Sequence, residues 1–117
     1  MGLTTTHGCW DGSCTSFNNW RRKLHSYASP GDSRTLDEAW VADHYADQSK
    51  PINVLMNHSD CDGDIPAEVC GPLADALQEI ADRMRADGSD TEALEDTEVF
   101  IAGLRGAEAY GEAVEFR

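Results

Sequence analysis

Apolar side chains recur at three- and four-residue steps in several stretches of the chain, and this spacing gathers them on one face of a helix. The clearest stretch begins at about Ser13 or Thr15 and stops at residues 29–32, a Ser-Pro-Gly-Asp segment that ends a helix. A weaker stretch covers residues 36–46, preceded by Thr35 as a helix-capping residue. The N-terminal half therefore predicts one long helix and one short helix.

Two more helices are predicted in the C-terminal half. The first carries an apolar stripe that Gly71 and Pro72 interrupt early, so we expect one turn, a kink and then a helix to about residue 85. Residues 87–98 are acidic and polar, which favours a solvated connection. The last helix is predicted from about residue 94 to residue 110, where Gly111 ends it.

Three short stretches favour strands. Residues 3–7 are Thr-rich, residues 52–56 are apolar and β-branched, and residues 113–116 alternate between apolar and polar. For residues 52–56 a short helix is the competing interpretation, because brief apolar runs are ambiguous. We expect a single α+β domain over residues 1–117, with a two- to three-stranded sheet that pairs the N- and C-terminal strands under about four helices.

The charge balance narrows the possible partners. Nine Lys and Arg against 22 Asp and Glu give a net charge of −13. Such a field repels phosphate backbones and anionic membranes, so we expect no direct contact with nucleic acid or membrane. The charge serves either solubility or docking on a basic protein. Four cysteines without a signal peptide are typical of reduced thiols in the cytoplasm.

Residues 20–23, Trp-Arg-Arg-Lys, are the only dense basic cluster in the sequence. They fall within the first predicted helix. We expect their charges to form its solvated side, paired with some of the many acids.

The most distinctive segment of the sequence is an acidic loop, His58-Ser59-Asp60-Cys61-Asp62-Gly63-Asp64. Aligned on its glycine, it resembles a calcium loop, with Asp60 and Asp62 as ligands. The first and last ligand positions of such a loop hold His58 and Val69, which lack the required carboxylates. Tight calcium binding is therefore disfavoured.

Zinc is the second metal interpretation of the same loop. His58 and Cys61 form one pair of soft ligands, and His7 and Cys9, at the end of the first predicted strand, form another. These residues, with Asp60 and Asp62, are the candidate metal ligands. Cys61 is also a candidate nucleophile, but the acids around it oppose thiolate formation.

A purely structural interpretation accounts for the same loop. In it, Asp60 and Asp62 bond loop amides, and Asp64 caps the helix that begins near Pro66. Trp10 and Asp64 are further candidate binding residues. The other two tryptophans, like Trp10, are more typical of the core of so small a domain than of a ligand cage.

Three segments of the sequence together resemble a family of small proteins from phages, prophages and actinobacterial and other Gram-positive genomes. The first segment is His7-Gly8-Cys9-Trp10-Asp11-Gly12 with Phe17 and Trp20-Arg21. The second is residues 55–63 with Cys70 and Leu73-Ala74, and the third is Phe100-Ile101-Ala102-Gly103-Leu104 with Gly111-Glu112 and Val114-Glu115-Phe116. The resemblance implies a phage or bacterial cytoplasmic setting and carries no activity with it.

No complete catalytic signature is present in the sequence: it has no phosphate-binding glycine loop, no serine elbow and no His-Glu-x-x-His pattern. The sequence therefore favours a non-enzymatic binding or modulator protein that acts on a host or phage protein. A metal- or ligand-binding domain centred on the acidic loop is the alternative. The oligomeric state is left open.

Overall fold

A computed structural model describes residues 2–117. Over this range the chain forms five α-helices, α1 (Cys14–Ala28), α2 (Leu36–Val41), α3 (Pro51–Met56), α4 (Ala67–Asp87) and α5 (Thr91–Tyr110), and a 3-10 helix, η1 (Thr6–Gly8). The strands are β1 (Gly2–Thr4), β2 (Asp11–Ser13), β3 (Asp64–Ile65) and β4 (Val114–Glu115). The predicted α+β class is confirmed, with the strands in two small antiparallel sheets, β1–β2 and β3–β4.

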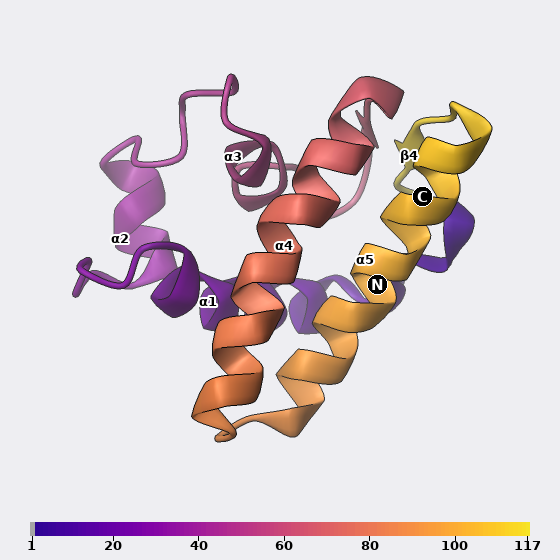
Figure 1. Cartoon of the computed structure of the whole chain (residues 1–117). Coiled ribbons are helices and arrows are strands. Elements are labelled where there is room, and N and C mark those ends of the chain that lie inside the picture. The colour runs from indigo at the N-terminus through magenta and orange to yellow at the C-terminus, as the bar shows by residue number, and fades with distance from the viewer. Residues whose placement is uncertain (1) are drawn as a thin grey trace.

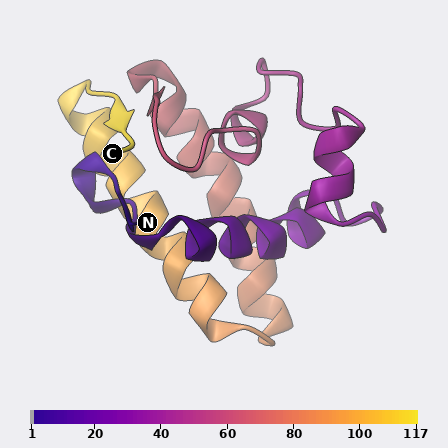
Figure 2. The same ribbon diagram turned by 180° about the vertical axis from the view of Figure 1, so that it is seen from behind.

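The long helices α4 and α5 lie side by side as an antiparallel hairpin (Figure 1), and α1 crosses behind them. The same crossing is seen from the other side in Figure 2, with α2 near the C-terminal end of α1 and α3 beside α4. The core fills the space between these helices. Its fully buried side chains include Leu3, Phe17, Leu24, Leu55, Ile65, Leu73, Leu77, Phe100, Leu104 and Val114.

The two ends of the chain are joined, as the sequence predicted. Thr5 and Phe116 form an antiparallel bridge. Beside it, the Thr4 amide donates to the Arg117 carbonyl at 3.1 Å, and the Arg117 amide donates to the Thr4 carbonyl at 2.8 Å. This bridge links the β1–β2 hairpin to the β3–β4 pair and ties both termini to the core.

The N-terminal segment also packs closely on α5 through Gly103. A Cβ added at Gly103 would lie 2.9 Å from both the Cys9 amide nitrogen and the His7 carbonyl oxygen, and would also meet the Cys9 sulfur. His7 itself adopts a positive φ of 60°. The absence of a side chain at Gly103 thus lets η1 and the Trp10 segment lie directly on α5.

Several local predictions were wrong. Residues 52–56 belong to helix α3, where Pro51 stands at a position in the first turn that needs no N–H donor. The predicted helix over residues 36–46 ends at Val41, because Asp43 turns to a positive φ of 56°. By contrast, α4 has the predicted turn before Pro72 and continues through that residue to Asp87 as one helix.

The acidic stretch over residues 87–98 is mostly helical rather than a connection. Gly88 ends α4 with a φ of 68°, and the Asp90 side chain caps α5 by accepting the Ala93 amide at 2.9 Å. The end of α5 is as predicted, at Gly111 with a φ of 65°.

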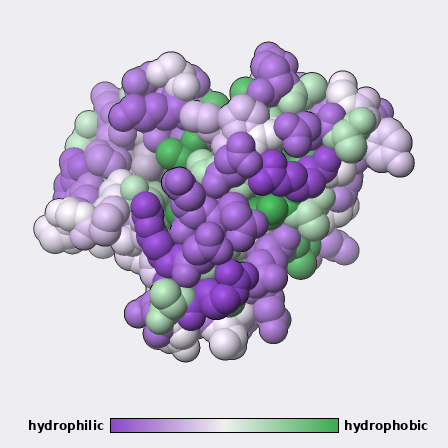
Figure 3. Space-filling model, viewed as in Figure 1, coloured by the Kyte–Doolittle hydropathy of each residue, from purple (hydrophilic) through white to green (hydrophobic). Residues whose placement is uncertain are grey.

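The surface over α4 and α5 is predominantly hydrophilic, with small separate apolar spots (Figure 3). No helix formed by residues 2–117 is long and apolar enough to cross a bilayer.

Candidate functional site

The acidic loop is built around the imidazole of His58. Its Nδ1 lies 2.8 Å from the Ser59 carbonyl oxygen and its Nε2 lies 2.9 Å from the Asp64 carbonyl oxygen. Phe116 packs on the ring with a centroid distance of 4.2 Å, and its amide donates to the Gly63 carbonyl at 2.9 Å. Both ring nitrogens therefore face loop carbonyls rather than an open ligand position.

A buried arginine fixes the start of this loop. The side chain of Arg21 is 2% exposed, and one guanidinium nitrogen donates to the carbonyls of Leu55, Met56 and His58 at 3.2, 3.4 and 2.6 Å. These carbonyls lie at or just beyond the end of α3, where a helix leaves its acceptors unsatisfied. The expectation that Arg21 belongs to the solvated face of its helix was wrong, because it caps α3.

The side-chain amide of Asn18 connects Arg21 to Asp60 in the acidic loop. Arg21 also donates to Asn18 Oδ1, and Asn18 Nδ2 donates to the Asp60 carboxylate at 2.6 Å. Burial lowers the pKa of Arg21 to about 10, and the Asp60 charge opposes that shift. Asp60 is thus bonded to a side chain of α1 and not, as the structural interpretation expected, to a loop amide.

The remaining candidates in the loop are separate from one another. Cys61 is exposed, with its sulfur 3.5 Å from Ser59 Oγ, and Asp62 is exposed. Asp64 lies in β3, and no side chain caps α4, so its predicted capping role was wrong.

The other predicted zinc pair is used in packing. His7 Nε2 lies 3.2 Å from Glu112 Oε1. Cys9 is fully buried against α5, and this burial raises the pKa of its thiol to about 12. Residues 2–117 contain no group of three or more His, Cys, Asp or Glu side chains placed to hold a metal ion. The six candidate ligands are therefore not brought together.

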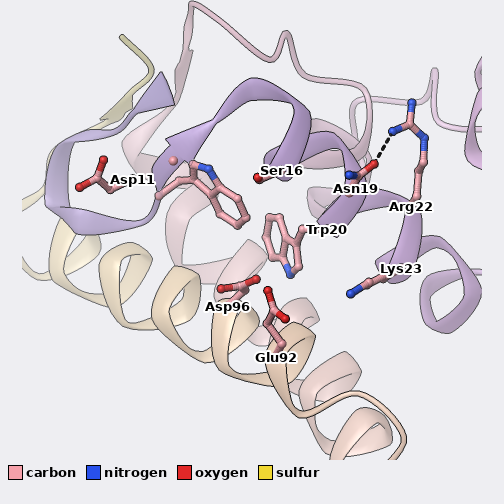
Figure 4. Close-up of a pocket in the computed structure, with 10 residues that line it drawn as sticks. Asp11, Ser16, Asn19, Trp20, Arg22, Lys23, Glu92 and Asp96 are labelled. Atoms are coloured by element: carbon pink, nitrogen blue, oxygen red, sulfur yellow. Dashed lines mark hydrogen bonds between the residues drawn. The ribbon is translucent and has the colours of Figure 1, made fainter. Parts of the chain in front are cut away.

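A cleft lies elsewhere, between α1 and the first turns of α5. It has a volume of about 610 Å³ and is lined by Trp10, Asp11, Gly12, Ser16, Asn19, Trp20, Arg22, Lys23, Glu92 and Asp96. A smaller hollow of about 180 Å³ also involves Trp10, Asp11 and Asp96. Figure 4 shows Glu92 and Asp96 projecting from α5 toward Trp20, whereas Arg22 points away from them toward Asn19. We call this feature the tryptophan cleft.

The charged groups of the tryptophan cleft are unevenly paired. Lys23 bonds Asp90 at 2.8 Å and Arg22 bonds Asp37 at 3.3 Å, so both cations are already matched by acids outside the lining. Within the described part of the chain, Asp11, Glu92 and Asp96 have no ion-pair partner. Burial, and then the neighbouring Glu92, raise the pKa of Asp96. Lys23 acts in the opposite direction and lowers the pKa of Asp96, so the cleft presents an excess of negative charge that is partly compensated.

Trp10, a predicted binding residue, forms the aromatic wall of the cleft together with Trp20, and their ring centroids are 5.3 Å apart. The indole nitrogens of Trp20 and Trp40 donate to Thr97 Oγ1 at 3.0 Å and to the Met56 carbonyl at 2.7 Å. The Trp10 nitrogen is buried and has no acceptor among residues 2–117. A buried N–H without an acceptor is uncommon in folded proteins, and Trp10 differs in this from the other two tryptophans.

A polar cluster that the sequence did not indicate lies where α1 meets α2. Ser29 Oγ is 2.8 Å from His44 Nε2, and Asp32 Oδ2 is 3.8 Å from His44 Nδ1. The guanidinium of Arg34 lies 3.2 Å from the same Nδ1 and can only donate to it. The proton of the neutral ring then sits on Nε2, facing Ser29, so His44 cannot accept the serine proton. The cluster therefore has the residue types of a catalytic triad, but its histidine is not placed to act as the general base for the serine.

No family model matches the sequence, and neither a curated relative nor a solved structure matches it.

Proposed function

We propose that this chain is a small acidic binding protein of phage or prophage type, which modulates a host or phage protein by docking on a basic surface of it. The observation that carries the proposal is the tryptophan cleft. There, three unpaired carboxylates lie beside two tryptophans, in a chain with a net charge of −13. Charge complementarity of this kind steers association and selects partners.

The arrangement of charge supports binding better than catalysis. Catalytic sites pair a perturbed acid or base with a nucleophile or a second proton carrier. The cleft instead offers carboxylates and indoles, which attract cations without reacting with them. The alternative of a metal site in the acidic loop lacks similar support, because both ring nitrogens of His58 face loop carbonyls.

The proposal is tested by capture on immobilised protein from lysates of Gram-positive bacteria, followed by carbodiimide coupling, which joins carboxylates to lysine amines. We expect a reproducible basic partner whose retention falls steeply as salt rises from about 50 to 300 mM, because screening weakens exposed ion pairs. Coupled peptides should include Asp11, Glu92 or Asp96. Capture of no reproducible partner, or retention that ignores salt, would overturn the proposal.

A further inference from the structure

We propose that Asp62, in the acidic loop, is a site of spontaneous covalent modification at which the residue isomerises to isoaspartate. This inference goes beyond the proposed function and does not depend on it. It is carried by a comparison within the chain, because the fold protects two of the three Asp–Gly pairs in the sequence and leaves one free. The pairs are Asp11–Gly12, Asp62–Gly63 and Asp87–Gly88.

The reaction joins a backbone amide to the preceding carboxyl group. The Gly63 nitrogen bonds to the side-chain carbon Cγ of Asp62, and the amide proton leaves with the carboxyl hydroxyl as water, which closes a succinimide ring. Water then adds to the former main-chain carbonyl and breaks its bond to the nitrogen. The chain now continues through Cγ, the old carbonyl is a free carboxylate, and the mass is unchanged. Glycine favours ring closure because it has no Cβ to hinder its nitrogen.

Asp62–Gly63 is the pair that the fold leaves free. Both residues are exposed and lie outside the helices and strands. The Gly63 N–H has no hydrogen-bond acceptor among residues 2–117, whereas the Gly63 carbonyl accepts the Phe116 amide at 2.9 Å. The nitrogen that must react is therefore unbonded in the folded protein.

Asp87–Gly88 is protected at both reacting groups. The Gly88 amide donates to the Met84 carbonyl at 2.8 Å, at the C-terminal end of α4. The Asp87 carboxylate accepts from Ser89 Oγ and, at 2.7 Å, from Tyr27 Oη, and these bonds lower the pKa of Asp87. The lowered pKa keeps the group ionised, and an ionised carboxylate loses an oxygen as water less readily than the neutral acid does.

Asp11–Gly12 is held in a strand. Both residues belong to β2, where Asp11 lies opposite Thr4 and Gly12 lies opposite the fully buried Leu3. The backbone of an antiparallel ladder is extended and is held by cross-strand hydrogen bonds. Ring closure would have to pull this segment out of the sheet, so Asp11 should react slowly although its side chain is exposed.

Isomerisation of Asp62 would displace the contact between the acidic loop and the C-terminal strand. It adds one carbon atom to the main chain directly before Gly63, whose carbonyl accepts the Phe116 amide. Phe116 also packs on the ring of His58. We therefore expect the isomerised protein to melt below the unmodified protein.

The test is incubation of the folded protein for several weeks in warm, mildly acidic buffer, followed by methylation with an isoaspartyl methyltransferase and peptide mapping. We expect isoaspartate at Asp62 to form at least about fivefold faster than at Asp11 or Asp87, the factor that corresponds to breaking one hydrogen bond of about 1 kcal/mol. In protein unfolded in guanidinium chloride the three sites should react at similar rates, because the protection is lost.

Conservative variants assign the signal. Asp62→Glu keeps the charge but would need a six-membered ring, so it should remove most of the methylation and the fall in Tm on incubation. The matched control Asp11→Glu alters another exposed Asp–Gly pair and should leave both as in wild type. Thermal melts of the fresh proteins check that each variant is folded.

Three results would overturn the inference. The first is isomerisation of Asp11 or Asp87 as fast as that of Asp62 in the folded protein. The second is methylation that persists undiminished in Asp62→Glu. The third is folded protein that forms no isoaspartate at Asp62 while the unfolded chain does.

Discussion

Replacement of Gly103 by alanine tests the close packing that builds one wall of the tryptophan cleft. Gly103 lies on α5 directly beneath the segment that leads into Trp10. The added methyl group would stand 2.9 Å from two backbone atoms, the Cys9 nitrogen and the His7 carbonyl oxygen. Neither atom belongs to a flexible side chain, so η1 as a whole must shift away from the helix.

The cost follows from two opposing effects. Forcing an extra methyl group into a packed interface typically costs about 1–3 kcal/mol. Alanine in place of glycine within a helix returns about 1 kcal/mol. The matched control is Gly106→Ala, one turn further along α5, where an added Cβ meets nothing within 4 Å. It receives the helix benefit without the clash, so the two variants should differ by the full packing cost.

Thermal and urea unfolding measure the difference. For a domain of this size, 1 kcal/mol corresponds to roughly 4 °C in Tm. We expect the Gly106→Ala Tm to be raised by about 4 °C and the Gly103→Ala Tm to lie about 4–12 °C below it. Equal stability of the two variants would refute the packing of η1 on α5 described above.

Three further predictions concern other parts of the chain. Asp96→Asn should raise the Tm at pH 7 and leave it unchanged near pH 3. The folded-state pKa of Asp96 is raised, so its ionisation costs stability as the pH climbs above about 4, and a Tm gain at pH 3 would contradict this. Arg21→Met should lower the free energy of unfolding by about 3 kcal/mol, because the α3 carbonyls lose a buried donor. Urea denaturation measures this loss, and a value below about 1 kcal/mol would refute the capping role. In native protein at pH 8, a thiol reagent should label exposed Cys61 fastest and buried Cys9 only on unfolding, since burial raises the pKa of Cys9 to about 12. Mass spectrometry of the digested protein measures the labelling of each cysteine, and early labelling of Cys9 would count against its burial.

Much of the fold follows from local patterns. The apolar spacing in α1 and the glycine at position 111 are local signals, and the structure bears them out. Residues 52–56 misled the prediction because their apolar, β-branched composition favours a strand, whereas Pro51 and the packing of α3 against α4 favour a helix. Such tertiary effects override propensity in short segments.

The site was harder to predict than the fold. Arg21 resembled its solvated neighbours in sequence, yet its position on α1 places it beneath the end of α3. The tryptophan cleft joins residues 10–23 with Glu92 and Asp96, which only the crossing of α1 and α5 brings together. The sequence indicated Trp10 as a candidate binding residue, but not the residues that surround it in the fold. The acidic loop was a candidate site because of its composition, but both ring nitrogens of His58 face carbonyls of the loop itself.

One comparison of partner capture tests most directly whether the tryptophan cleft or the acidic loop binds the partner. The cleft variant Glu92→Gln/Asp96→Asn and the loop variant Asp62→Asn/Asp64→Asn each remove two negative charges from exposed or half-buried acids. Quantitative mass spectrometry of the captured proteins, at equal loading and salt, compares both with wild type. We expect the cleft variant to lose most of the partner and the loop variant to retain it. Retention by the cleft variant together with loss by the loop variant would contradict the account.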